Sequence, residues 1–191
     1  MTGTGTEGST DVTITSGVDG QLPVTTAGLA AGRTAEGDLA PGADDQYRVE
    51  VAEGTSLARF DVRAGDRASD LDLALYRLGA DGTPEQVAVS ATGSADELID
   101  VLEPEAGTYV VQVAGYAAAP GKTTAPYALT TYAVTPDTTE GNLTVAPNPV
   151  PVTAGEPATF SLGWSGLEAG TRYLGWMTFG DSPTPTVVAI D

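Results

Sequence analysis

Apolar and polar residues alternate along three short runs between Ser69 and Tyr116, and turn-forming clusters separate the runs. The first run carries Leu71, Leu73 and Leu75 at every second position. A period of two places successive side chains on opposite faces of an extended strand, so that one face is buried and the other meets water. Short strands of this kind, joined by frequent turns, are typical of β-sandwiches and barrels. We therefore expect an all-β fold.

Histidine and cysteine are absent from all 191 residues. Histidine is the commonest general base, cysteine is a common nucleophile, and both are ligands for transition metals. The 24 glycines and 13 prolines suit a chain with many turns between short strands. The composition therefore favours a binding or accessory module over an enzyme.

Acidic residues outnumber basic residues by 26 to 8, which gives a net charge of -18. This charge repels phosphate backbones and anionic lipid headgroups. No apolar run approaches the roughly 20 residues that a membrane-spanning helix needs. We expect neither nucleic acid nor a membrane as a partner.

The length and the changes in composition predict two β-units. Residues 1–10 are mostly Gly, Thr and Ser and are expected to form a linker. The first unit is expected over residues 11–136, because the polar segment that follows has no apolar periodicity. Residues 137–142 then form a second linker, and residues 143–191 form a smaller unit of up to five strands.

Two local expectations concern the first unit. The stretch 26–42 is rich in glycine and alanine and is expected to be a long connection. The runs 47–51 and 58–62 both alternate and flank a tight turn at Glu53 and Gly54, which predicts an antiparallel hairpin.

The smaller unit contains several aromatic residues close together in the sequence. Phe160, Trp164, Trp176 and Phe179 are expected to pack against one another in its hydrophobic core.

Three acidic residues form a candidate metal site. Asp70 and Asp72 lie two apart in one strand, and Asp96 belongs to a later turn. Calcium takes about six to eight oxygen ligands, commonly from carboxylates in loops. The plainer interpretation is that these side chains cap turns through backbone N–H groups, and it remains open beside calcium. The sequence indicates no other cofactor.

Two further candidates depend on residue type alone. The segment Gly163–Gly166 reads GWSG, but a nucleophile elbow needs a glycine two residues after the serine, where Leu167 stands, and a histidine partner, which the chain lacks. A module that binds protein or carbohydrate would instead expose aromatic residues on one strand face. The candidates for that face are Tyr76, Tyr116, Tyr132 and Trp176.

An ordered series of motifs resembles the bacterial pre-peptidase C-terminal domain. The motifs are DLDL at Asp70–Leu73, SADE at Ser94–Glu97 and AGTY at Ala106–Tyr109, and the resemblance spans residues 44–134. The tail, with GLEAGTRYLG at Gly166–Gly175, resembles the small fibronectin-like or immunoglobulin-like unit that follows this domain in secreted subtilisin-like proteases of high-GC Gram-positive bacteria.

The resemblance implies a jelly-roll-like β-sandwich followed by a smaller fibronectin-like or immunoglobulin-like unit. It implies a non-catalytic accessory region of a secreted serine protease, acting in secretion, stability or docking to a protein or polysaccharide substrate. The catalytic protease domain of the parent chain would then be a partner, and the missing signal peptide would mean that the chain is a fragment. The alternatives are a carbohydrate- or protein-binding module of another exported hydrolase, or a cell-surface adhesin.

Overall fold

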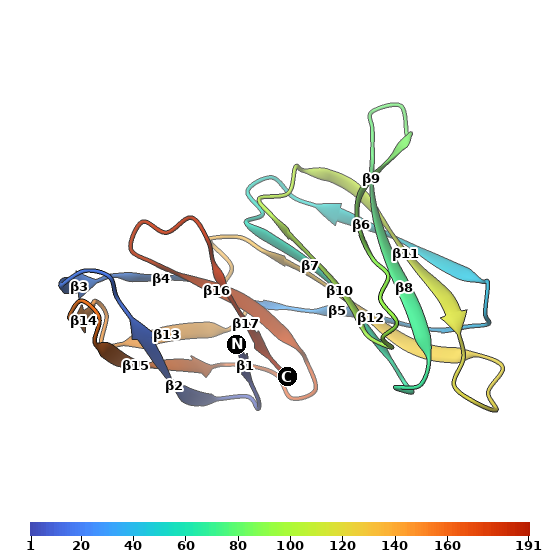
Figure 1. Cartoon of the computed structure of the whole chain (residues 1–191). Helices are drawn as coiled ribbons and strands as arrows, with labels where there is room; N and C mark the ends of the chain where they lie inside the picture. Colours follow the sequence, from blue (N-terminus) through green and yellow to red (C-terminus); the bar gives the residue numbers. More distant parts are fainter. The chain divides into compact units, whose positions relative to one another are not determined.

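The computed structural model describes residues 1–191 and contains seventeen β-strands and no helix, so the all-β prediction is confirmed. No helix that could cross a membrane is therefore present. The chain divides into two compact units, one made of residues 1–32 and 134–191 and the other of residues 33–133 (Figure 1). The second unit is thus inserted into the first, and we call them the host unit and the inserted unit.

The strands of the inserted unit are β5 (Arg33–Leu39), β6 (Asp44–Val51), β7 (Leu57–Ala64), β8 (Asp70–Leu78), β9 (Pro84–Ser90), β10 (Glu97–Leu102), β11 (Gly107–Ala117) and β12 (Ala125–Val134). They form two four-stranded sheets with the orders β10-β7-β12-β5 and β6-β11-β8-β9. The pairs β10–β7, β12–β5, β6–β11, β11–β8 and β8–β9 are all antiparallel. The unit is a two-sheet sandwich.

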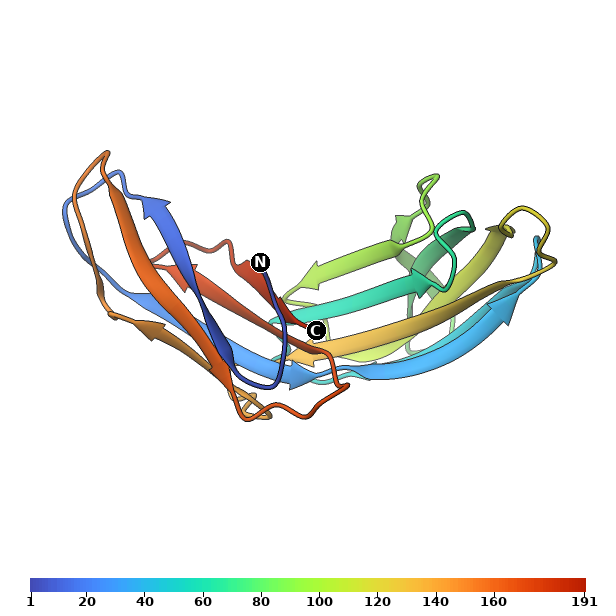
Figure 2. The same ribbon diagram turned by 90° about the horizontal axis from the view of Figure 1, so that it is seen from below.

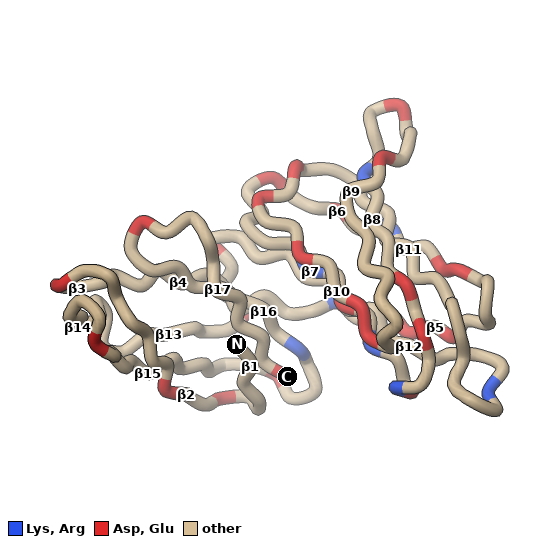
Figure 3. The backbone as a smooth tube through the Cα atoms, viewed as in Figure 1, with Lys and Arg blue, Asp and Glu red and all other residues tan.

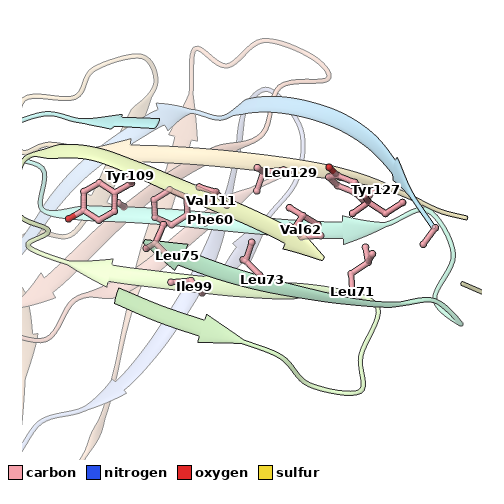
Figure 4. Packing of buried hydrophobic residues seen from close by; sticks show 14 of the residues in the cluster. Phe60, Val62, Leu71, Leu73, Leu75, Ile99, Tyr109, Val111, Tyr127 and Leu129 are labelled. Carbon is pink, nitrogen blue, oxygen red and sulfur yellow. The ribbon is translucent and has the colours of Figure 1, made fainter. Parts of the chain in front are cut away.

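The core of the inserted unit follows from the period of two. Leu71, Leu73 and Leu75 are each 0% exposed, while Asp70 and Asp72 between them keep partial contact with water. Figure 4 shows these leucines one after another along β8, within the core that also contains Phe60 and Tyr109, whose ring centroids lie 6.5 Å apart. Strand β8 therefore buries one face in the core and leaves the other on the outside of the sandwich.

The hairpin predicted for the runs 47–51 and 58–62 is wrong. Both strands exist, but β6 pairs with β11, whereas β7 pairs with β10 in the opposite sheet. The turn at Gly54 therefore carries the chain from one layer to the other. The physical reason is that both strands contribute to one core, Val51 from β6 and Phe60 from β7, and they do so from opposite sides.

The strands of the host unit are β1 (Thr2–Gly3), β2 (Gly8–Thr15), β3 (Gly20–Leu22), β4 (Val24–Ala31), β13 (Asn142–Ala146), β14 (Val150–Val152), β15 (Pro157–Ser165), β16 (Tyr173–Phe179) and β17 (Thr186–Ile190). They form a β1-β17-β16-β4 sheet, a β13-β15-β2 sheet and a two-stranded β14-β3 ribbon. Figure 2 shows the blue first strands beside the orange and red last strands, in agreement with the pairings β2–β15 and β4–β16.

The expected linker at residues 1–10 and the expected connection at residues 26–42 both differ from the structure. The first segment contains β1 and the start of β2, and the second contains most of β4 and all of β5. Glycine has a packing role in the first segment. A Cβ atom on Gly8 would lie 2.5 Å from Trp164 Cζ2, and one on Gly3 would lie 2.8 Å from Trp164 Cη2. These glycines let the backbone approach the indole ring closely.

The unit boundaries also differ from the expected division. The expected first unit, 11–136, combines residues from both observed units, and the expected linker 137–142 lies within the host unit. The five strands expected in 143–191 are present, but β1–β4 complete their sheets. Phe160 and Trp164 are buried in this unit, whereas Trp176 and Phe179 are half-buried. A core of about 50 residues is small, and the N-terminal strands supply the missing partners.

Candidate functional site

Three of the predicted site residues meet in a depression on the outside of the β6-β11-β8-β9 sheet. Asp70 and Asp72 of β8 line it together with Tyr116 and the turn Ala91–Gly93, and its volume is about 330 Å³. The β8–β11 register shifts between Gly115 and Ala117, so Tyr116 lies at a β-bulge. A bulge redirects side chains, and Tyr116 is 71% exposed.

The ionised form of Asp72 is disfavoured in this depression. Burial is the main cause that raises the pKa of Asp72, and the charges of Asp70 and Glu97 raise it further. Oδ1 of Asp70 is buried and accepts no hydrogen bond. Negative charge is therefore concentrated around Asp72, and the buried Oδ1 of Asp70 has no donor beside it.

Asp96 does not join the other two carboxylates. Its Oδ1 accepts a 2.9 Å hydrogen bond from the backbone N–H of Ala64, and Ser94 Oγ donates to its backbone oxygen at 2.6 Å. Asp96 is therefore a turn and strand-end cap, as the plainer interpretation predicts. No group of three or more acidic residues comes together in the structure in a way that could hold a metal ion. The three candidate ligands Asp70, Asp72 and Asp96 therefore do not converge on one point.

Glu97 is the acidic residue whose role the sequence did not indicate. It is 3% exposed, and its carboxylate accepts hydrogen bonds from the hydroxyls of Ser90 and Thr92 and from the Thr92 N–H. Burial acts to raise the pKa of Glu97, but these hydrogen bonds outweigh it and lower the pKa. The three polar residues Ser90, Thr92 and Ser94 just before the glutamate are the signal that could have predicted this cage.

The four candidate aromatic residues do not form one binding face. Tyr76 of β8 is half-buried and is paired with Val110 on β11 and Gln86 on β9. Tyr132 is 6% exposed, and Trp176 is half-buried in the host unit. Tyr116 is therefore the exposed member of the set.

The GWSG segment ends strand β15 and contains the buried Trp164. Ser165 Oγ lies 3.5 Å from Asn142 Nδ2 on the neighbouring strand. This is the geometry of a paired strand, and a nucleophile elbow would instead join a strand to a helix.

A second depression, which the sequence did not indicate, lies between β5 and β6. It has a volume of about 350 Å³, and we call it the β5–β6 groove. Its lining consists of Arg33, Thr34 and Ala35 of β5, Tyr47, Arg48, Val49 and Glu50 of β6, and Leu129 and Thr131 of β12. Both β5 and β6 are edge strands, each in a different sheet. The groove is therefore the open side of the sandwich.

Hydrogen bonds connect three polar side chains beside this groove and hold them in place. Tyr127 Oη donates a 2.6 Å hydrogen bond to Asp45 Oδ2, and the Tyr47 and Tyr127 hydroxyls lie 2.7 Å apart. Burial, followed by the hydrogen bonds to Asp45 and Tyr47, raises the pKa of Tyr127. Because Tyr127 gives its proton to Asp45, Tyr47 is the donor in the pair of hydroxyls.

Residues 44–115 match the family model described as the bacterial pre-peptidase C-terminal domain. The match begins with β6 and runs almost to the end of β11, within the inserted unit, and it confirms the resemblance over these residues. Domains of this family are non-catalytic and occur in secreted proteins. No curated protein matches the chain.

The likenesses to solved structures are weak. The Yersinia pseudotuberculosis-derived mitogen is 11% identical, with 53% of this chain and 84% of the mitogen covered and a TM-score of 0.42. PliG of Aeromonas hydrophila, a periplasmic lysozyme inhibitor, is 18% identical, with 55% and 87% covered and a TM-score of 0.38. VP2 of infectious bursal disease virus is 13% identical, with 84% and 41% covered and a TM-score of 0.37. At these TM-scores the likenesses carry no argument about function.

Proposed function

We propose that this chain is a non-catalytic accessory region of a secreted subtilisin-like serine protease, acting in secretion, stability or substrate docking. The observation that carries the proposal is the match of residues 44–115 to the pre-peptidase C-terminal domain. The sequence also contains no histidine and no cysteine for catalysis. The host unit, with its two facing sheets and ribbon, is proposed as the fibronectin-like or immunoglobulin-like companion.

The proposal is tested first on the purified chain. It is expected to hydrolyse fluorescent casein and a mixed peptide library no faster than the buffer blank. Hydrolysis that purifies with the chain would contradict the proposal. The reading frame around this segment is expected to encode a subtilisin-like catalytic domain, and a frame without any hydrolase would contradict the assigned parent.

The accessory role itself is tested in the parent. A variant of the parent without these 191 residues is expected to reach the medium in smaller amount, to unfold at a lower temperature, or to lose activity on insoluble substrate while small peptides are still cleaved. A parent unchanged in all three measurements would contradict the role.

A carbohydrate- or protein-binding role is the second candidate, and exposed Tyr116 beside a depression favours it. Retention on insoluble chitin or cellulose that Tyr116→Ala abolishes would support this role. An adhesin remains a third class, for which repeated copies of the module and no protease domain are expected in the gene.

A further inference from the structure

The β5–β6 groove combines two cationic side chains with an apolar floor in a strongly acidic protein. The net charge is -18, and only eight residues are Lys or Arg (Figure 3). Four arginines lie against carboxylates: Arg59, Arg63, Arg77 and Arg172. The other four cationic residues, Arg33, Arg48, Arg67 and Lys122, have no ion pair, and two of them line this groove.

The floor of the groove is part of the sandwich core. Leu129 is 1% exposed and belongs to the core cluster, against which Tyr47 and Val49 pack. On the β5 side, the inward position opposite Leu129 is occupied by Ala35, whose small side chain does not close the side of the sandwich. An apolar side chain from outside could therefore lie over Leu129, between the two sheets.

The rims of the groove carry unpaired backbone groups. Strand β5 has β12 as its one neighbour, and β6 has β11 as its one neighbour. An edge strand presents free N–H and C=O groups, to which an extended polypeptide can add as a further strand. The two arginines specify the charge of such a polypeptide, because complementary charge selects partners and orients them.

We propose that the β5–β6 groove binds an extended acidic segment of another polypeptide. The backbone of the segment pairs with one edge strand, its carboxylates lie on Arg33 and Arg48, and one apolar side chain covers Leu129. A second copy of this chain is a poor occupant, because two molecules of charge -18 repel each other. The inference deepens the docking role proposed above and takes that role as given.

The test measures binding of a fluorescein-labelled octapeptide of alternating Asp and Val by fluorescence anisotropy, with the complete 191-residue chain. A peptide with Lys in place of Asp is the control probe. We expect the Asp peptide to bind and the Lys peptide to bind at least about tenfold more weakly, although overall charge favours the opposite order. Hydrogen exchange is expected to show new amide protection along β5 or β6.

Matched variants separate the groove from general charge. Arg33→Glu with Arg48→Glu is expected to weaken binding at least about tenfold, whereas Arg67→Glu with Lys122→Glu, which changes the net charge equally, is expected to change it less than about twofold. Ala35→Leu, which fills the groove without a change of charge, is also expected to weaken binding. Thermal melting confirms that each variant is folded.

Four results would overturn the inference. These are no binding of the Asp peptide up to millimolar concentration, equal binding by the Arg33→Glu/Arg48→Glu variant, equal loss in the control variant, and a dimer in sedimentation that depends on Arg33 and Arg48. The assay uses the chain without a protease. A failure here therefore leaves the accessory role standing, and the deletion in the parent tests that role separately.

Discussion

Leu29 and Gly141 exchange two backbone hydrogen bonds, each 3.1 Å long. The chain leaves the host unit after Gly32 and returns to it at Val134, so this pair joins the two host segments that flank the insertion. A Cβ atom on Gly141 would lie 2.2 Å from Leu167 Cδ2 and 3.2 Å from Leu29 Cβ, which explains the glycine. The two host segments on either side of the insertion are therefore held together by residues of the host unit itself.

The pairing of Leu29 with Gly141 predicts that the two units fold separately. The two core clusters share no residue, and each draws only on residues of its own unit. A host unit in which a short Gly-Ser linker joins residue 32 to residue 134 is expected to fold. The inserted unit, residues 33–133, is also expected to fold alone, because Arg33 and Thr131 near its two ends are paired between neighbouring strands. Circular dichroism and calorimetry check both pieces, and a piece without a cooperative transition would contradict the division.

A second prediction concerns Gly37, which lies beneath the ring of Tyr127. A Cβ atom there would lie 2.3 Å from Tyr127 Cζ, and the ring is held because its hydroxyl is bonded to Tyr47 and Asp45. Gly37→Ala is expected to destabilise the inserted unit by about 1–3 kcal/mol, the usual cost of overpacking. Urea denaturation measures this change in the free energy of unfolding. The control is Gly93→Ala, where a Cβ atom meets nothing within 4 Å; equal losses at both sites would refute the argument.

The sequence predicted the parts of the fold that local alternation encodes. Strand β8 was predicted because leucine recurs at every second position, and the structure buries each of these leucines completely. Strand β4 was missed because its alanines and glycine have low strand propensity and several neighbouring positions are buried, so no alternation appears. The insertion was missed because pairing partners such as Val12 and Phe160 are far apart in the sequence and leave no local signal.

The candidate site was predictable only within one strand. The period of two placed Asp70 and Asp72 on one face, and both line the same depression. It did not place Asp96, which bonds to the backbone of Ala64 on another sheet. The β5–β6 groove depends on two strands in different layers, and a pattern read along one strand cannot show which strands face each other.

The cage around Glu97 gives a third prediction. Glu97→Gln replaces a carboxylate that only accepts by an amide that also donates, so the donors Ser90 and Thr92 lose part of their partner. We expect a loss of about 1–3 kcal/mol at neutral pH. Because the pKa of Glu97 is lowered in the folded state, this contribution is complete above the unfolded pKa of about 4.3 and is lost as the pH falls through the lower folded value.

The measurement is urea denaturation of both proteins from pH 7 to pH 3. The difference between wild type and Glu97→Gln is expected to shrink as the pH falls below about 4. Glu53→Gln, at an exposed turn position, is the control and is expected to have a small effect at every pH. A difference that stayed constant over the range would contradict a role of the charge.

Calcium is expected to have no effect on stability. Asp70 and Asp72 share the depression, but Asp96 is held elsewhere, so the three predicted ligands do not converge. Two carboxylates alone leave most of the about six to eight ligand positions of calcium unfilled. The midpoint of thermal unfolding is expected to be the same in millimolar calcium and in chelator, and a higher midpoint in calcium would show that ligands outside this set take part.

The last prediction follows from the crowding of charge around Asp72. Its pKa is raised in the folded state by burial and by the charges of Asp70 and Glu97, so ionisation of Asp72 opposes folding. Asp72→Asn is therefore expected to stabilise the inserted unit by about 0.5 kcal/mol, an amount typical of partly exposed charges. The gain is complete above the folded pKa and vanishes below the unfolded pKa of about 3.9, where both states bind the proton. Thermal unfolding of wild type and Asp72→Asn from pH 8 to pH 3 measures this gain in stability. The substitution Asp137→Asn, at an exposed position, changes the net charge equally and is the control. An equal gain in the control would assign the effect to overall charge.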